Sequence, residues 1–257
     1  MLVKSERRSE LIAFEDTKAG VKGLVDAGLT KSQAFSTLNH KSRGREAMIM
    51  PKSVVNHGIP VDVLDRITNG IREFYEQDSE LKKKFYKRFG MKVFYQSNYN
   101  LYQSSAADWR DTFGCFVAPD PPKPEVPSVC RGCFFLVDHY YPACPELELT
   151  LGSSKHTNGS FITILLQDQV GGLQVLYENQ WLITNDKFIS VDHRVRAKNV
   201  GPRISVASFF RPYVYGENSK VYGPIKELLS EENPQIYQEV DIKDYLAYYF
   251  SKERSLH

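Results

Sequence analysis

The chain has 257 residues and carries 33 Lys and Arg against 31 Asp and Glu, so its formal net charge is +2. Hydrophobic residues make up 42% of the sequence and charged residues 25%. This ordinary globular composition excludes a wholly disordered, collagen-like or coiled-coil chain. The balanced charge does not match the basic footprint of a nucleic-acid-binding protein, and no apolar run reaches membrane-spanning length. We therefore expect neither nucleic acid nor a membrane as a partner.

The N-terminus and the cysteines indicate the compartment. The first eight residues, MLVKSERR, have no apolar segment after their charges, so they do not predict a secretory signal. The sequence contains four cysteines, and without a signal these are expected to be reduced thiols. The sequence therefore predicts a cytoplasmic protein.

Residues 1–130 are predicted to form a helical N-terminal region. Apolar residues recur near helical spacing over Ser9–Ala27, and Gly28 can end that helix. Residues 32–53 have no clear period and predict an irregular segment.

The second part of this region contains clearer signals. Val54–Pro60 predicts a short strand that enters a turn. Val61–Gln77 predicts an amphipathic helix with Leu64, Ile67, Ile71 and Phe74 on one face. Ser79 is expected to cap a further helix that ends near Phe89. Residues 117–129 hold five prolines and predict an extended connector.

From residue 131 to residue 257 the pattern becomes mainly β. Short runs rich in β-branched and aromatic residues alternate with Gly, Asn, Asp and Pro, which is typical of a sandwich or barrel. A short helix over Pro224–Ser230 and a terminal helix over Ile242–Ser251 are predicted to follow. The predicted strands are Phe134–Tyr141, Leu147–Leu151, Phe161–Gln167, Leu173–Tyr177, Phe188–Val195 and Ile204–Phe210.

Two histidines and an asparagine form the first group that could carry chemistry. On a strand, residues i and i+2 point to the same face, so His156 and Asn158 would project together. His193 lies in another predicted strand. Two histidines and a nearby third group resemble a facial metal triad, in which the third ligand of Fe(II) is a carboxylate. The alternative is structural, because Asn158-Gly159 between β-like runs is a strong hairpin signal.

A second group consists of Arg203, Ser205 and Tyr141. Arg203 and Ser205 share one face of a predicted strand, and an Arg fork beside a hydroxyl can bind a carboxylate in two-point fashion. Tyr141, before a proline turn, could add its hydroxyl to the same carboxylate. The structural alternative for Arg203 is an outward-facing arginine on a strand, and for Tyr141 it is a tyrosine in the core or at its rim.

Three other functions are weighed. Cys130 and Cys133, with Cys144 and His139, could bind zinc, but a second CxxC pair is missing. Lys82–Arg88 interleaves basic residues with rings, but acidic residues precede it, so a solvated helical face of mixed charge is favoured over a nucleic-acid site. No G-x-S-x-G, P-loop or G-x-G-x-x-G motif supports a hydrolase or a nucleotide-binding protein.

Taken together, these groups lie in a recognisable order. The chain resembles plant 2-oxoglutarate- and Fe(II)-dependent dioxygenases, especially the group of 1-aminocyclopropane-1-carboxylate oxidase homologues. The resemblance covers most of residues 5–31 and 54–250. The stretches that carry it include RSELIAFEDTKAGVKGLVDAG, VVNHGIP, WRDTFGCFVAPDPPKP, HYYPACPELELTLGSSKHTNGSF, LITNDKFISVDHRV and GPRISVASFF.

The resemblance implies a mainly β fold, a double-stranded β-helix (jelly roll) with flanking helices. It implies that His156 and His193 are iron ligands and that Asn158 fills the position of the ligating aspartate. Arg203 and Ser205 match the pair that holds the distal carboxylate of 2-oxoglutarate, and Tyr141 matches a further contact to it. Fe(II) and the cosubstrate 2-oxoglutarate are thus the implied cofactors, and ascorbate is left open.

The sequence also departs from the family. Asn158 supplies a neutral amide, so Fe(II) binding weaker than that of relatives is expected. Segments of the family are missing between Trp181 and Leu182 and before Gly132, and residues 32–53 are unrelated to it. The jelly roll is therefore expected to be incomplete, with an exposed strand edge that favours aggregation.

The resulting hypothesis is an oxidoreductase that uses O2 to oxidise a small organic metabolite of plant specialised metabolism. The alternative is a non-catalytic family member or truncated isoform without a competent iron site. The folded chain is expected to be a monomer.

Overall fold

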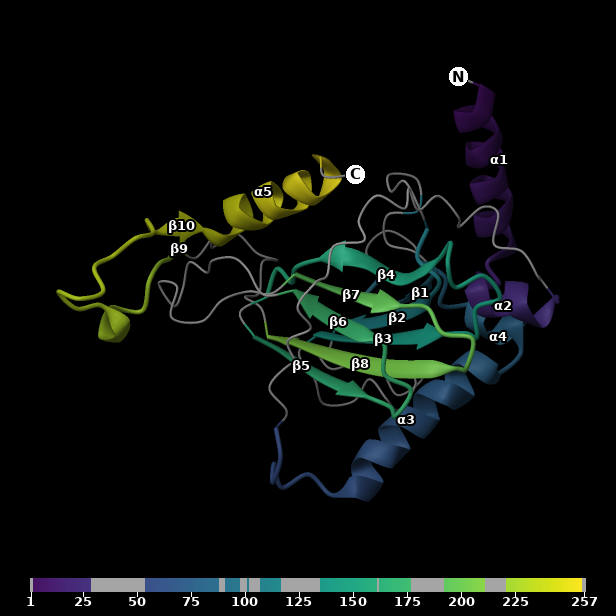
Figure 1. Cartoon of the computed structure of the whole chain (residues 1–257), viewed down its shortest axis with the longest axis horizontal. Helices are drawn as coiled ribbons and strands as arrows, with labels where there is room; N and C mark the ends of the chain where they lie inside the picture. Colours follow the sequence, from purple (N-terminus) through teal and green to yellow (C-terminus); the bar gives the residue numbers. More distant parts are fainter. Residues whose placement is uncertain are drawn as a thin grey trace.

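The computed structural model describes most of the chain, and two antiparallel sheets dominate it (Figure 1). A mainly β architecture with flanking helices is therefore confirmed. The described residues are 2–28, 54–87, 91–97, 101, 107–116, 135–160, 162–176, 192–210 and 221–255.

The larger sheet has five strands in the order β1-β2-β3-β8-β5, and every neighbouring pair is antiparallel. Strands β1 and β2 precede residue 131, so this sheet draws on both sides of the change in sequence character. The division of the chain into regions at that residue stays a prediction. The five strands are β1 (Val93–Gln96), β2 (Asp111–Phe116), β3 (Phe135–Tyr141), β8 (Arg203–Phe210) and β5 (Ile162–Gln167).

The smaller sheet has three antiparallel strands in the order β4-β7-β6. Because β4 and β5 lie in different sheets, the Asn158-Gly159 segment between them crosses from one sheet to the other. The hairpin interpretation of Asn158-Gly159 is therefore wrong. The strands are β4 (Leu151–His156), β7 (Asp192–Arg196) and β6 (Leu173–Leu176).

Helices flank these sheets, with α3 and α5 on opposite sides in the view of Figure 1. Among the described residues, no helix is both long and apolar enough to cross a membrane. A two-stranded ribbon of β9 (Val221–Tyr222) and β10 (Val240–Asp241) leads into α5 (Ile242–Ser255). The remaining helices are α1 (Leu2–Thr17), α2 (Gly20–Asp26), α3 (Val61–Glu76), α4 (Ser79–Lys83) and the 3-10 helix η2 (Lys226–Leu228).

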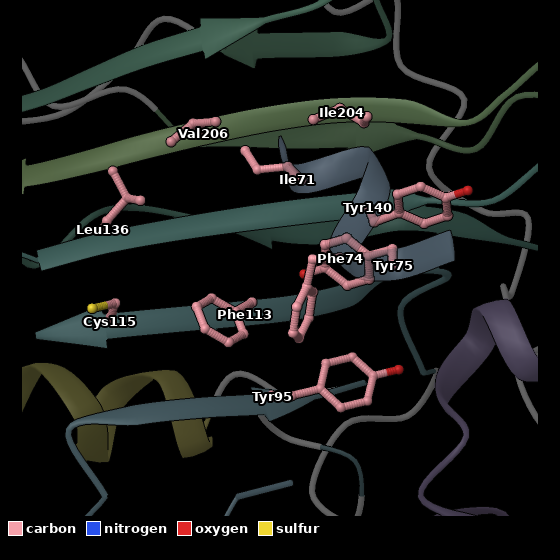
Figure 2. Close-up of a cluster of buried hydrophobic side chains, with 10 residues drawn as sticks. All are labelled: Ile71, Phe74, Tyr75, Tyr95, Phe113, Cys115, Leu136, Tyr140, Ile204 and Val206. Atoms are coloured by element: carbon pink, nitrogen blue, oxygen red, sulfur yellow. The ribbon is translucent and has the colours of Figure 1, made fainter. Parts of the chain in front are cut away.

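Helix α3 covers one face of the large sheet with aromatic and aliphatic side chains. Ile71, Phe74 and Tyr75 of α3 are buried against β1, β2, β3 and β8, as Figure 2 shows. The Phe74 ring meets the Phe113 ring edge-on at a centroid distance of 4.6 Å. Burial of such rings is the main source of stability in a core of this kind. The cluster consists of Ile71, Phe74, Tyr75, Tyr95, Phe113, Cys115, Leu136, Tyr140, Ile204 and Val206.

Helix α2 is fixed to the large sheet by a carboxylate. Asp111, the first residue of β2, accepts hydrogen bonds from the backbone N–H groups of Val21 and Lys22 at 2.7 and 2.8 Å. Gly20 permits this approach, because it has φ +73° and a Cβ there would lie 2.5 Å from the Asp111 carboxylate. The amino end of α2 thus lies directly beside the start of β2.

Many predicted elements are confirmed. The helix expected over Val61–Gln77 is α3, and the terminal helix is α5. The first helix ends at Gly28 with φ +77°, as predicted, but Lys18 at φ 52° divides it into α1 and α2. Strands β3, β5, β6, β7 and β8 lie within or close to the predicted runs.

Other expectations are wrong. Val54–Pro60 contains no strand, and Leu147–Leu149 forms a turn ahead of β4. Strands β1, β2 and most of β4 were not predicted. For β2 and β4 the reason is that Asp111, Gly114 and Gly152-Ser153-Ser154 are poor strand formers. Tertiary pairing overrides these weak local preferences.

The basic segment that begins at Lys82 is not simply a solvated helical face. Lys82 is 2% exposed, and its Nζ donates to the carbonyl oxygen of Tyr75 at 2.6 Å. Burial lowers the pKa of Lys82. Lys83 instead contacts Glu80 on the surface at 2.6 Å, so the lysines of this segment have different roles.

Several predictions lie outside the described residues. These are the irregular segment 32–53, the proline-rich connector 117–129, the junctions at 131–132 and 181–182, and the zinc-site residues Cys130 and Cys133.

Candidate active site

The face of the large sheet opposite α3 carries polar side chains in register. In an antiparallel sheet, directly opposed residues point to the same side. Thr112 opposes His139, His139 opposes Ser205, and Ser205 opposes Gln167. These four residues form a first row across β2, β3, β8 and β5.

A second row lies next to the first. Tyr141 opposes Arg203, and the register of Asp111 with Tyr140 places Arg110 beside Tyr141 on the other side. Arg110 lies one residue before the start of β2, and its side chain interacts with that of Tyr141. Tyr141 is therefore flanked by two arginines.

Arg203 is a buried cation with unused hydrogen-bonding capacity. It is 2% exposed, and it donates from Nη1 to Ser205 Oγ at 3.0 Å and from Nη2 to Gln167 Oε1 at 2.9 Å. Its guanidinium lies 4.8 Å from the centroid of the Tyr141 ring. Its Nε has no hydrogen-bond partner, and none of the described carboxylates forms an ion pair with it. A buried cation in such surroundings favours an anionic ligand.

His156 and His193 are brought together by the small sheet. They are opposed residues of β4 and β7, and their ring centroids lie 4.3 Å apart. The Nδ1 of His156 donates to the carbonyl oxygen of Ser154 at 2.7 Å when this nitrogen carries the proton. That tautomer leaves Nε2 with a lone pair for a metal, as is usual for ligating histidines.

The electrostatics show that the two rows and the histidine pair face a common region. Burial, followed by the charges of His193 and Arg110, lowers the pKa of His156 to about 3. Burial and then Arg110, His156, Arg203 and His193 lower the pKa of His139 well below its usual value. His139 is therefore neutral at physiological pH, and its Nδ1 lies 3.1 Å from Thr112 Oγ1.

Asn158 lies just beyond the end of β4, so strand alternation does not extend from His156 to it. It is half-buried. Helix α5 contacts this segment, since the Tyr249 hydroxyl donates to the carbonyl oxygen of Thr157. A Cβ at Gly159 would lie 3.1 Å from the Tyr249 ring. The C-terminal helix thus contributes to the position of Asn158.

The segment before β2 is fixed to both sheets. Asp108 Oδ1 accepts from the N–H and hydroxyl of Ser154 at 2.7 Å each. Trp109 is fully buried, and its backbone N–H donates to Leu151 O at 2.8 Å while its indole donates to Pro142 O at 3.1 Å. Arg110, next along the chain, lies with Nη2 3.2 Å from Asp108 Oδ2.

The residues present fit a carboxylate better than they fit the usual iron triad. Arg203 and Ser205 offer the donors that a buried carboxylate needs. The histidine pair offers two nitrogen ligands, but no group of three His, Cys, Asp or Glu within the described ranges could hold a metal ion. Asn158 stands where the carboxylate is expected. Cys144, proposed for zinc, is a free and buried thiol.

Sequence reasoning missed several residues of this site. Gln167, Asp108, Arg110 and Tyr249 have no motif of their own. Strand register brings Gln167 beside Ser205, and Tyr249 reaches the site from 92 residues along the chain from Thr157. The Asp-Trp-Arg-Asp run at residues 108–111 offered one signal, because buried charges are uncommon and are paired or functional.

Two family models match the chain. The model of the 2OG-Fe(II) oxygenase superfamily matches residues 132–212, and the model of the non-haem dioxygenase in morphine synthesis N-terminal region matches residues 53–140. The chain belongs to the 2OG-Fe(II) oxygenase superfamily. This confirms the resemblance, the class of oxidoreductase and dioxygenase, and the family's Fe(II) and 2-oxoglutarate.

Two of the curated relatives illustrate the similarity, and both come from plants. The chain is 41% identical to 1-aminocyclopropane-1-carboxylate oxidase homolog 1 of Arabidopsis thaliana, over 96% of this chain and 93% of the relative. It is 38% identical to deacetoxyvindoline 4-hydroxylase of Catharanthus roseus, over 98% of this chain and 88% of the relative. Both relatives align over nearly their whole length.

The alignment also shows where the length differs. It runs over 342 positions with the Arabidopsis relative, whereas this oxygenase has 257 residues. The relative therefore carries internal residues that this chain lacks. This supports the prediction of an incomplete jelly roll.

Solved structures confirm the fold. The oxygenase superposes on JOX2 in complex with 2OG, Fe and JA with a TM-score of 0.62 at 24% identity, covering 76% of each chain. It superposes on the dioxygenase for auxin oxidation of rice with a TM-score of 0.57 at 18% identity, covering 77% of this chain and 84% of that one. The jelly roll expected from the sequence is thus shown.

Proposed function

We propose that this oxygenase binds 2-oxoglutarate between its two sheets and oxidises a small organic metabolite of plant specialised metabolism. The observation that carries the proposal is Arg203, a buried guanidinium with an unpaired Nε and no carboxylate partner among the described residues. Such a group is costly to bury alone, so a ligand carboxylate would stabilise it.

Arg203, Ser205 and Tyr141 are proposed to hold the distal carboxylate of 2-oxoglutarate. Gln167 accepts from one end of the guanidinium and so orients it. The Tyr141 ring packs against the guanidinium plane and excludes water from it. In the low dielectric of this interior, a charge-assisted hydrogen bond is stronger than in water.

His156 and His193 are proposed as the iron ligands, with the Asn158 side-chain oxygen as the third. Bound Fe(II) would supply O2-dependent oxidation coupled to decarboxylation of 2-oxoglutarate. The contribution of the chain is to hold the imidazoles in place: Ser154 fixes the His156 tautomer, and the β4–β7 register sets the spacing of the rings. A neutral amide at residue 158 leaves positive charge uncompensated, so weak Fe(II) binding is expected.

The substrate class rests on the relatives. The name deacetoxyvindoline 4-hydroxylase, of the plant Catharanthus roseus, gives deacetoxyvindoline as the substrate of that protein, and the structure of JOX2 holds JA beside 2OG and Fe. For this chain we propose the same broad class, with O2 and with ascorbate left open as an additional reductant. A cytoplasmic monomer is also proposed, and the free, buried thiol of Cys144 supports a reducing compartment.

The test is a comparison of the wild type with Asn158→Asp. Anaerobic Fe(II) titration in the presence of 2-oxoglutarate, followed by the visible charge-transfer band, gives the Fe(II) affinity, and O2-dependent succinate formation gives the turnover. We expect weak wild-type signals and an Fe(II) affinity at least about tenfold higher in the variant, because changes of outer-shell partners alone alter metal affinity by about that much.

The matched control is Asn199→Asp, which adds the same charge at an exposed position and is expected to leave the affinity unchanged. Peptide mass spectrometry verifies that residue 158 is Asn in the wild-type sample. If neither the wild type nor Asn158→Asp shows a band or forms succinate, the chain is not a competent oxygenase and the proposal fails.

A further inference from the structure

Arg110 is a second buried guanidinium in this region, and no role has been assigned to it so far. Its side chain is 13% exposed. Nη2 lies 3.2 Å from Asp108 Oδ2, but Nε has no hydrogen-bond partner in the described structure. Arg110 and Arg203 are thus both buried cations in the interior face, each with an unpaired Nε.

The register places these two arginines at opposite sides of one residue. Arg203 on β8 is opposed to Tyr141, and Arg110, which immediately precedes β2, interacts with Tyr141 from the other side. The Tyr141 ring lies against Arg203. Burial lowers the pKa of Arg110, but Asp108 and then Tyr141 outweigh it, so the pKa of Arg110 is raised. The backbones of Arg110 and Arg203 are separated by two strand spacings, about 10 Å. Two long side chains that extend toward each other can shorten this distance to the length of a short dicarboxylate.

Arg110 also lies on the histidine side of the region. Asp108, its ion-pair partner, accepts from Ser154, and Ser154 in turn accepts from His156. The ligand group that Arg110 can reach is therefore the one nearest the histidine pair.

We propose that Arg110 binds the C1 carboxylate of 2-oxoglutarate, at the end opposite to the carboxylate held by Arg203. This inference rests on the proposed function, because it assigns a second residue to the same ligand. Two guanidinium groups would then bind two carboxylates, so the site selects a dicarboxylate.

The competing explanation is structural. The Asp108–Arg110 pair and the buried Trp109 fix the start of β2 to β4, so Arg110 could serve stability alone. A structural role changes the melting temperature but does not change which ligand is preferred. Ligand preference is therefore the measurement that separates the two explanations.

The experiment uses metal-free protein and two ligands, 2-oxoglutarate and levulinate. Levulinate keeps the distal carboxylate and the ketone but has a methyl group in place of the C1 carboxylate. Calorimetric titration of the wild type and of Arg110→Gln gives the ratio of the two dissociation constants. We expect wild-type protein to prefer 2-oxoglutarate by about 10- to 100-fold, which corresponds to a hydrogen bond with a charged group.

In Arg110→Gln this preference is expected to fall close to one, with levulinate affinity largely kept. Arg203→Gln is expected to weaken the binding of both ligands, since both contain the distal carboxylate that Arg203 is proposed to bind. Arg196→Gln, at an exposed position of β7, is the control and keeps the wild-type ratio. Arg110→Lys retains the charge and is expected to restore part of the preference.

Each result decides a specific point. If Arg110→Gln, or Arg110→Met where the Gln variant does not fold, keeps the wild-type ratio, Arg110 does not bind C1 and the inference is wrong. Wild-type protein that binds neither ligand would instead refute the proposed function.

Discussion

At the scale of single residues, this protein places charged groups in its interior on both faces of the large sheet. Arg203 and Arg110 face the region between the sheets, whereas Asp138 and Asp111 lie fully buried toward the α3 side. The Tyr75 hydroxyl donates to Asp138 Oδ1 at 2.7 Å. Burial raises the pKa of Asp138 to about 7, although Tyr75 and the Phe113 N–H oppose this shift.

Asp138 predicts a pH dependence of stability. The folded pKa of about 7 exceeds the value of about 4 in an unfolded chain. Folded protein therefore binds more protons over this interval, so stability is lost as pH rises from about 4 to about 7. The loss amounts to at most about 4 kcal/mol. Asp138→Asn, whose amide oxygen can still accept from Tyr75, is expected to flatten this slope in urea unfolding between pH 5 and 8.

In Asp138→Asn, some decrease of stability with rising pH is expected to remain. It comes from Asp111, because burial raises the pKa of Asp111 to about 6. Asp65→Asn, at an exposed position of α3, serves as the control and should follow the wild type. Equal slopes for Asp138→Asn and the wild type would show that Asp138 does not control this dependence.

At the scale of elements, strand alternation separates the core from the site. Along β2, Phe113 and Cys115 join the cluster under α3, while Thr112 faces the polar rows. Along β3, Tyr140 packs on Tyr75 at a centroid distance of 4.8 Å, while His139 and Tyr141 face the other way. A rigid apolar face therefore holds the polar face in register.

The packing of α3 predicts a large loss of stability on truncation of Phe74. This ring contacts the rings of Tyr75, Phe85, Tyr95 and Phe113. Phe74→Ala is expected to lower the free energy of unfolding by about 3–5 kcal/mol, because it removes buried area and leaves a cavity. Tyr248→Ala removes an aromatic ring that is 63% exposed and should cost less than about 1 kcal/mol. Denaturant unfolding that gave similar losses for both would contradict this packing.

At the scale of the whole molecule, the large sheet exposes apolar side chains on its last described strand. Strand β5 pairs with β8, and its residues Ile162 and Ile164 are 61% and 56% exposed. They lie on the same face as Leu166, which packs against the α3 cluster. The Arabidopsis relative has additional internal residues, and these could cover the apolar surface that β5 exposes here.

This surface predicts aggregation that increases with protein concentration. The double variant Ile162→Thr and Ile164→Thr keeps β-branched side chains but removes exposed apolar area, so it is expected to raise the soluble monomer fraction. Light scattering after size-exclusion chromatography measures this fraction. Ile12→Thr, which changes an exposed residue of α1, is the control. A wild type that stays monomeric at high concentration would refute the prediction.

Local patterns predicted the elements that have a strong period. The apolar face of α3 and the β-branched runs of β3, β5 and β8 are visible in the sequence. Strands β2 and β4 were missed because Asp, Gly and Ser occupy them, and those strands form through pairing with β3 and β7. The same pairing defines the candidate site, since it opposes Arg203 to Tyr141 and His156 to His193.

The sequence by itself determined the family and the class of chemistry, because these depend on residue type and order along the chain. It also predicted the site residues Tyr141, His156, Asn158, His193, Arg203 and Ser205, which stay proposals. Only the tertiary structure decided that Arg110 and Gln167 belong to the same region and that Tyr249 of α5 contacts the segment containing Asn158. Such neighbours are set by strand register and by packing between distant segments. These depend on the free energy of the whole fold rather than on any local preference.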